Sequence, residues 1–224
     1  ALPISLSSLA HGTLYVNRNV DEDDSVESYT GKIFESAMAS LDQVHHSLDM
    51  SAINRAVDLL TQAKKIAFFG LGSSAAVAHD AMNKFFRFNV PVIYSDDIVL
   101  QRMSCMNCND DDVVVIISHT GRTKSLVELA QLARENDAMV IAITSPGTPL
   151  SREATLAITL DVPEDTDIYM PMVSRLAQLT VIDVLATGFT LRRGAKFRDN
   201  LKRVKEALKE SRFDKELSVH SNNQ

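Results

Sequence analysis

Two short segments of the sequence combine glycine with hydroxyl side chains in an order suited to binding a phosphate group. The first, Gly70-Leu71-Gly72-Ser73-Ser74-Ala75, has a glycine that permits a tight turn and exposes the amides of Ser73 and Ser74 at the start of a helix. The second, Ser118-His119-Thr120-Gly121-Arg122-Thr123, brings three hydroxyls within six residues. Such amides and hydroxyls replace the hydration of a phosphomonoester with neutral donors.

Each segment also has a simpler interpretation. The first matches the G-x-G-x-x-A form of a dinucleotide fingerprint, with Asp96 near the distance of a ribose-binding acid, although a lone G-x-G is weak evidence. N-capping of a helix explains one hydroxyl of the second segment but not three. If the segments lie side by side, we expect one ligand site formed by Gly72, Ser73, Ser74, Ser118, His119, Thr120, Gly121 and Thr123.

The hydrophobic pattern indicates which elements hold these segments. Strands are predicted at 65–70, 91–94, 113–118, 138–144 and 156–160, and helices at 74–88, 98–103 and 123–135. The strands are apolar on both faces, as parallel strands covered by helices on both sides require. The prediction is therefore an α/β fold with a doubly wound, five-stranded parallel sheet. Both segments then follow the carboxyl ends of strands, where ligands bind in such sheets.

Helices are predicted before and after the sheet. Acidic residues 21–24 are expected to start a helix that carries an apolar stripe from Ile33 to Val44, and a second helix covers 51–63. After a loop at 162–171, an apolar helix covers 172–191, and an amphipathic helix then carries Phe197, Leu201, Val204 and Leu208. We expect a linker remnant at 1–20, one domain at 21–213 and a tail at 214–224.

Composition excludes several classes of protein. A chain of 224 residues suits one large domain, and its apolar runs are far too short to cross a membrane. The first residues lack the basic start and cleavage pattern of a secretory signal. A net charge of −6 argues against a surface that mainly clamps nucleic acid, and acids interleave the basic residues of the final helix.

The two cysteines, Cys105 and Cys108, form a single C-x-x-C. Because no second pair or nearby histidine completes a four-ligand shell, no metal site is predicted. A redox role is the minor alternative to two structural thiols at the end of a short helix. We expect reduced thiols in a cytoplasmic protein, without a cofactor.

Together, the two glycine- and hydroxyl-containing segments resemble the phosphosugar-binding signature of the sugar isomerase (SIS) domain. Val173-Ser174-Arg175-Leu176-Ala177-Gln178-Leu179 with Ile182-Asp183-Val184-Leu185 is similar to a helix of the RpiR family of bacterial transcription regulators. This resemblance extends from about Ser25 to Phe213. It implies a flavodoxin-like three-layer sandwich that binds a phosphorylated sugar acid, with 2-keto-3-deoxy-6-phosphogluconate as the expected effector.

The resemblance also implies roles for particular residues. Ser74 and Ser118 match the family's chief phosphate hydroxyls, and Thr120 and Thr123 match the remaining hydroxyl positions. In the same comparison, Ser73 and Gly121 shape the loops. Family members carry a helix-turn-helix head ahead of this domain, and only about twenty residues precede the acidic patch here. We therefore expect a homodimeric sensor that contacts operator DNA only through a missing N-terminal part.

The main alternative is an aldose-ketose isomerase, which needs a base poised over the sugar. His119 and His79 have no obvious carboxylate partner in the sequence. The catalytic glutamate of similar isomerases corresponds to positions 168–170, whereas Glu164, Asp165 and Asp167 are displaced from it. Sensing without catalysis is thus the preferred function, isomerisation the second, and dinucleotide binding the third.

Overall fold

A five-stranded parallel sheet forms the centre of the computed structural model, which describes residues 20–167 and 170–209. The strands lie in the order β2-β1-β3-β4-β5, and every neighbouring pair is parallel. The predicted sheet is confirmed, and each strand boundary lies within one residue of its prediction. The strands are β1 (Lys65–Gly70), β2 (Val92–Ser95), β3 (Asp112–Ser118), β4 (Met139–Thr144) and β5 (Leu156–Thr159).

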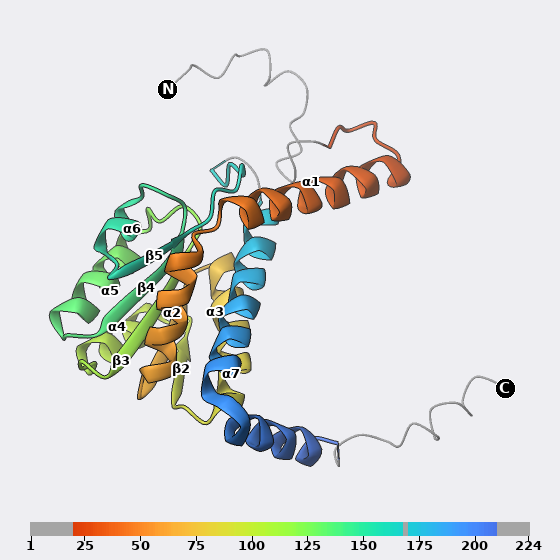
Figure 1. Ribbon diagram of the computed structural model, residues 1–224. Helices are drawn as coiled ribbons and strands as arrows, with labels where there is room; N and C mark the ends of the chain where they lie inside the picture. The colour runs from red at the N-terminus through yellow and green to blue at the C-terminus, as the bar shows by residue number, and fades with distance from the viewer. Residues whose placement is uncertain (1–19, 168–169, 210–224) are drawn as a thin grey trace.

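Helices cover both faces of this sheet and complete a three-layer sandwich (Figure 1). Alternate residues of β1 point into the two layers: Ile66 and Phe68 join one apolar core, and Ala67 and Phe69 join the other. The first layer contains α2 (Met50–Gln62), α3 (Ser73–Phe85) and α7 (Val173–Ala207), and the second contains α4 (Ile98–Met106), α5 (Lys124–Glu135) and α6 (Pro149–Glu153). Burial on both faces explains why the strands are continuously apolar.

The predicted helices are present, with differences at their ends. The helix expected at 74–88 divides into α3 and a short 3-10 helix, η2 (Phe86–Phe88). Helix α6 was not predicted because five residues are too few for helical periodicity, although Thr148 caps it and Pro149 begins it. Among the described helices, none is long and apolar enough to cross a membrane.

Helix α7 joins the two helices predicted after the sheet and bends at Gly194, whose φ and ψ are 76° and −163°. Phe189 and Phe197, on either side of the bend, both pack against Phe88, with ring centroids 5.1 and 5.6 Å away. This aromatic contact holds the two parts of α7 at a fixed angle. The predicted tail at 214–224 lies outside the described residues, as do residues 1–19 of the predicted linker.

Helix α1 (Val26–Ser47) begins after the acidic patch rather than within it, with Ser25 as its N-cap. Hydrogen bonds from Lys32 (2.7 Å) and the Ser28 hydroxyl (2.6 Å) to Asp24 lower the pKa of that carboxyl to about 2. The acidic patch is therefore an ion-paired turn that leads into the helix. The expectation that it starts the helix itself was wrong.

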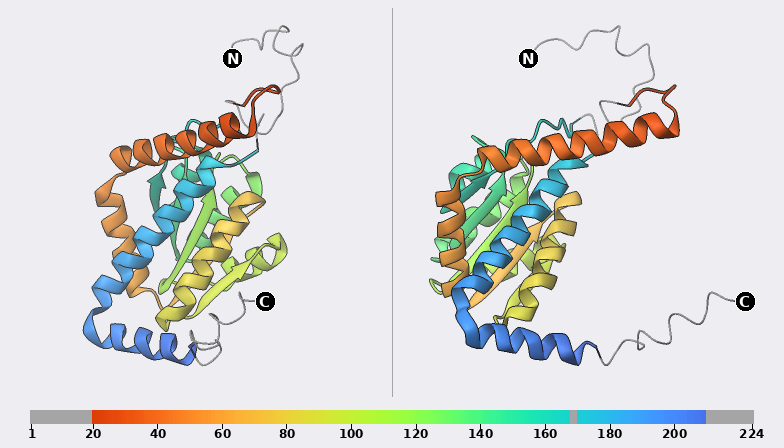
Figure 2. Two further views of the ribbon diagram at one scale, coloured as in Figure 1. Left: turned by 90° about the vertical axis from the view of Figure 1, so that its right-hand side faces the viewer. Right: turned by 45° about the vertical axis from the view of Figure 1, so that its right-hand side comes forward.

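The apolar stripe of α1 is only partly buried. Val44 belongs to the core, whereas Phe34 and Met38 are 66% and 60% exposed. Near the end of the helix, the Gln43 side chain donates a hydrogen bond to the carbonyl of Asp161 at 3.1 Å. The start of α1 and the part of α7 after the bend project from the same side of the sandwich (Figure 2).

Candidate functional site

The two glycine- and hydroxyl-containing loops meet at the carboxyl ends of neighbouring strands. Strands β1 and β3 pair directly, with Gly70 opposite Ile117. The chain leaves β1 toward β2 and returns to the other side of β1 for β3, so both tips flank the point where the strand order reverses. The predicted juxtaposition of the two loops is confirmed. Helices α3 and α5 start there, one on each face of the sheet.

The first loop turns sharply at Gly72. Its φ of 57° and ψ of −129° strain any residue with a side chain, and Gly72 is the N-cap of α3. Ser74, in the first turn of α3, is buried at 7% exposure, and Ser73 is half-buried. The turn therefore directs the start of α3 toward the tip of β1.

A buried glutamine supports this loop from behind and was not predicted. Gln101 of α4 is fully buried, and its Nε2 donates to the carbonyls of Ser95 at 2.7 Å and Gly70 at 3.3 Å. It thereby ties the ends of β1 and β2 together. A single glutamine in a short helix gives no sequence signal for such a contact.

In the second loop, hydroxyl oxygens accept hydrogen bonds from backbone amides. Ser118, 5% exposed, accepts from the amide of Gly121 at 3.2 Å, and Thr120 accepts from the amide of Arg122 at 3.4 Å. Because a hydroxyl that accepts one bond still has its own O–H to donate, both side chains keep a donor for a ligand. Thr123 is the N-cap of α5, yet its side chain makes no capping bond.

The helices that begin at these loops differ from the other capped helices of the protein. Helices α1, α2, α4 and α6 each have an N-cap side chain that accepts a hydrogen bond from a first-turn amide. At α3 and α5, the N-caps Gly72 and Thr123 make no such bond. The positive ends of two helix dipoles thus face the strand tips without a side-chain cap. This arrangement stabilises an anion there.

Gly121 holds the second loop against the end of β4. It is buried with a φ of 57°, and an added Cβ would collide with the hydroxyls of Thr144 and Thr148. Its carbonyl accepts from the amide of Leu150 at 3.1 Å. Neither threonine was predicted to matter, although Thr144 ends β4 directly opposite Ser118.

The segment that precedes α7 lies beside the second loop. His119 Nε2 is 3.2 Å from the backbone carbonyl of Glu164, and Arg122 contacts both carboxylate oxygens of Asp167 at 2.7 and 2.8 Å. His79 is exposed, with its ring 4.9 Å from that of Tyr94. The side chains of these two histidines therefore contact a carbonyl and an aromatic ring, respectively.

Glu164 caps the start of α7 from eight residues away. Its carboxylate accepts from the amides of Met172 and Val173 at 2.7 Å, from the amide of Ser174 at 3.1 Å, and from the Ser174 hydroxyl. Partial burial alone would raise the pKa of Glu164, but the bonds from Ser174, Met172 and Val173 outweigh it and lower the pKa below 4.5. Sequence reasoning considered this residue only as a displaced catalytic acid.

Replacing Glu164 by Gln is expected to lower the free energy of unfolding by about 1–2 kcal/mol at pH 7, the range for losing a helix cap. Because the pKa is lowered in the folded state, this stabilisation is complete above the ordinary value of 4.5 and is lost as the pH falls through the folded-state value. Urea unfolding of the wild-type chain and of Glu164→Gln should thus show a difference in the free energy of unfolding that becomes smaller below pH 4.5. Asp161→Asn, which changes an exposed side chain, is the control, and a pH-independent difference would contradict the assignment.

Two apolar hollows lie away from the strand tips. One of about 550 Å³ lies between α2 and α7, and one of about 470 Å³ lies between α1 and α7. Their linings contain none of the residues of the two loops. Because a phosphate requires polar donors, we place the candidate site at the strand tips and not in these hollows.

Two cysteines and one surface cluster carry further reactive groups among residues 20–167 and 170–209. Cys105 and Cys108 are free thiols, and burial raises the pKa of Cys105 to about 12, as a structural thiol requires. Asp42, His45 and His46 bring possible metal-ligand atoms within 4.8 Å of one another on α1. All three are exposed and lie outside the two loops.

Residues 59–188 match the family model of the SIS domain. This chain belongs to the SIS domain family. Over 210 residues, the SIS-domain chain is 92% identical to the HTH-type transcriptional regulator HexR of Escherichia coli (strain K12), with 94% of this chain and 73% of that protein covered. It is 55% identical to HexR of Pseudomonas aeruginosa over 92% of this chain and 72% of that protein. The SIS domain is thus of the kind found in HexR transcriptional regulators.

A solved structure supports the same fold. The NanR protein of Vibrio vulnificus, complexed with ManNAc-6P, superposes with a TM-score of 0.76 over 84% of this chain and 72% of that chain. The sequences are 23% identical, so this likeness concerns the fold alone.

Proposed function

We propose that this SIS domain binds the phosphate of a phosphorylated sugar acid between the tips of β1 and β3. In this proposal it is the effector-binding part of a HexR-type transcriptional regulator, and 2-keto-3-deoxy-6-phosphogluconate is the effector. The observation that carries the proposal is the meeting of two helix N-termini, α3 and α5, whose N-cap residues leave the amides without a side-chain cap. The sugar phosphate complexed with NanR in the same fold adds support.

The proposal gives each site residue a role. The hydroxyls of Ser74 and Ser118 are the chief hydrogen-bond donors to the phosphate. The hydroxyls of Thr120 and Thr123 are the remaining donors. Gly72, Ser73 and Gly121 set the course of the two loops. His119 lines the site and holds the segment before α7 through the carbonyl of Glu164.

We further propose that the domain has no isomerase activity. The close relatives are named transcriptional regulators. Glu164 accepts four hydrogen bonds at the start of α7, and a carboxylate so engaged is a poor base. The His119 ring contacts the backbone carbonyl of Glu164, and a carbonyl does not orient a histidine as a base in the way that a carboxylate does. These contacts favour binding over proton transfer.

Thermal-shift measurements with a panel of ligands test the function. Ligands that bind the folded state raise its melting temperature. We expect 2-keto-3-deoxy-6-phosphogluconate to raise it more than neutral sugar phosphates or NAD(P), and NMR to show the sugar phosphates unchanged after incubation. Stabilisation by NAD(P) alone would favour a dinucleotide-binding module. Isomer interconversion abolished by His119→Ala would instead favour an isomerase.

The proposal includes a homodimer in the cytoplasm, with operator DNA bound through a helix-turn-helix part of the regulator, the type that the names of the HexR relatives state. Support for the dimer comes from large apolar side chains exposed on α1, at 68% for Val26 and 66% for Phe34, and on α7, at 67% for Leu191. Sedimentation of the chain at micromolar concentration checks this part, and a monomer there would contradict it.

A further inference from the structure

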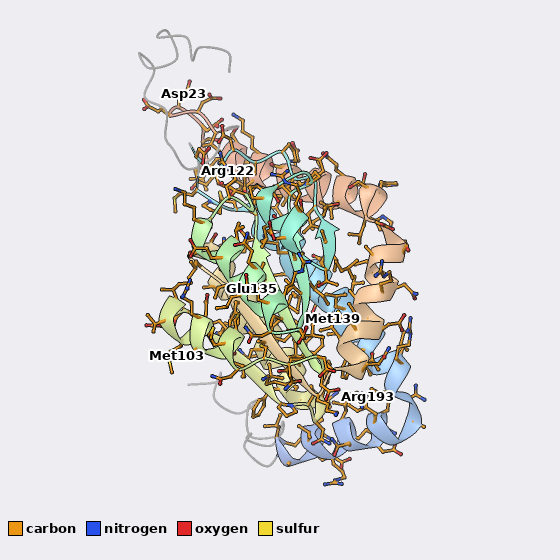
Figure 3. The ribbon with its side chains drawn as sticks, turned by 90° about the vertical axis from the view of Figure 1, so that its left-hand side faces the viewer. Asp23, Met103, Arg122, Glu135, Met139 and Arg193 are labelled. Carbon is orange, nitrogen blue, oxygen red and sulfur yellow. The ribbon has the colours of Figure 1, made fainter. Side chains whose placement is uncertain are left out.

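Arg122 differs from the other side chains of the two loops in charge and in direction. Within residues 70–74 and 118–123 it carries the sole permanent charge, whereas the hydroxyls and amides around it are neutral. Its side chain reaches the segment before α7, where one guanidinium nitrogen contacts both carboxylate oxygens of Asp167. In Figure 3, Arg122 lies at the opposite end of the sheet from Met139, the first residue of β4, and therefore at the carboxyl ends of the strands.

The ion pair is open to solvent. The side chains of Arg122 and Asp167 are 58% and 66% exposed, so water and salt screen their attraction. A guanidinium binds carboxylates through a planar fork of N–H groups, and one carboxylate can replace another on it without a change in chemistry. The pair is therefore held weakly enough to be exchanged.

The place of Arg122 in the second loop favours exchange with a carboxylate of a ligand bound at that loop. Arg122 lies between Gly121 and Thr123, and its own amide donates to the Thr120 hydroxyl. The residue that carries the guanidinium is thus an immediate neighbour of the hydroxyl residues that are proposed to hold the phosphate. Binding of the phosphate tethers the ligand, and tethering raises the effective concentration of a second group on the same ligand. Asp167, which is tethered by its own segment, is the internal competitor for that group.

We propose that Arg122 determines specificity for sugar phosphates that carry a carboxylate, and that the ligand's carboxylate replaces Asp167 on its guanidinium. This inference rests on the proposed phosphate site. The neutral donors at the strand tips bind the phosphate that all such ligands share, whereas Arg122 distinguishes the acids from the neutral sugars. Asp167 keeps the guanidinium paired until an acid binds.

Two ligands that differ at one carbon test the assignment. In 6-phosphogluconate the first carbon is a carboxylate, and in glucitol 6-phosphate it is a hydroxymethyl group. By calorimetry, we expect the wild-type chain to bind the acid about tenfold more tightly, the effect of one charge-assisted hydrogen bond. Arg122→Gln should reduce that preference to about one and change the affinity for glucitol 6-phosphate little. Asp167→Asn should raise the affinity for the acid severalfold, because it removes the competitor.

The controls separate this inference from the proposed function. Ser74→Ala should lower the affinity for both ligands by a similar factor and leave the preference for the acid unchanged. If Arg122→Gln lowers the affinity for both ligands equally, or if it leaves the preference for the acid unchanged, the assignment of Arg122 is wrong. The proposed phosphate site is not contradicted by either result. If neither ligand binds the wild-type chain, this inference is wrong, and the thermal shift with 2-keto-3-deoxy-6-phosphogluconate decides the proposed function separately.

Discussion

Substituting alanine for Ser74 or Ser118 is expected to weaken the binding of 2-keto-3-deoxy-6-phosphogluconate by roughly fivefold to 150-fold. This range corresponds to about 1–3 kcal/mol, the cost of leaving a charged group short of one hydrogen bond. Both side chains are buried at the strand tips, so water replaces the lost hydroxyl poorly. Calorimetric titration of each variant gives the dissociation constants directly.

The two serine variants differ in their expected effect on stability. Ser118 also accepts a hydrogen bond from the amide of Gly121, so Ser118→Ala loses about 1 kcal/mol of folding free energy as well. Thr187→Ala is the matched control, because that exposed hydroxyl bonds a carbonyl of its own helix, α7. Unchanged affinity in both serine variants would place the ligand site elsewhere.

Gly121→Ala is expected to lower the free energy of unfolding by about 2–6 kcal/mol. A side chain at φ 57° costs about 1–3 kcal/mol in backbone strain, and the collision of its Cβ with Thr144 and Thr148 adds about 1–3 kcal/mol of overpacking. Because the same loop carries Ser118 and Thr120, ligand affinity should fall together with stability. Chemical unfolding followed by circular dichroism measures the first effect, and calorimetry measures the second.

Gly147→Ala separates strain from collision. Gly147 has a similar φ of 68°, but nothing lies within 4 Å of the position that its Cβ would take. The free energy of unfolding of this variant should therefore fall only by the strain contribution, about 1–3 kcal/mol, and its ligand affinity should be unchanged. Equal destabilisation by the two substitutions would show that Thr144 and Thr148 do not confine the second loop.

The sheet could be predicted because its signal is local and repeated. Residues 112–118 and 139–144 are apolar at nearly every position, and such runs fit parallel strands covered on both faces. The two loops could be predicted because glycine and hydroxyl residues stand directly after β1 and β3. Their position side by side then depended only on the strand order, in which β1 and β3 are neighbours.

The supporting contacts could not be predicted, because they join residues far apart in the sequence. Gln101 bonds the carbonyl of Gly70 across 31 positions, and Arg122 pairs with Asp167 across 45. Glu164 was recognised as an acid near the site, but its bonds to the start of α7 depend on how the intervening loop folds. Apolar periodicity likewise could not show that Phe34 and Met38 are exposed, since periodicity does not distinguish a core from an uncovered face.

The contact between Gln43 and Asp161 gives α1 the geometry of a lever. One end of the helix is attached to the segment that holds Glu164 and Asp167, and the other end projects from the body (Figure 2). The part of α1 from Gln43 to Val26 is about 26 Å long, so a rotation of about 5° at Gln43 moves Val26 by about 2 Å. A displacement of residues 161–167 too small to disturb the sheet would thus become a movement of about 2 Å at Val26.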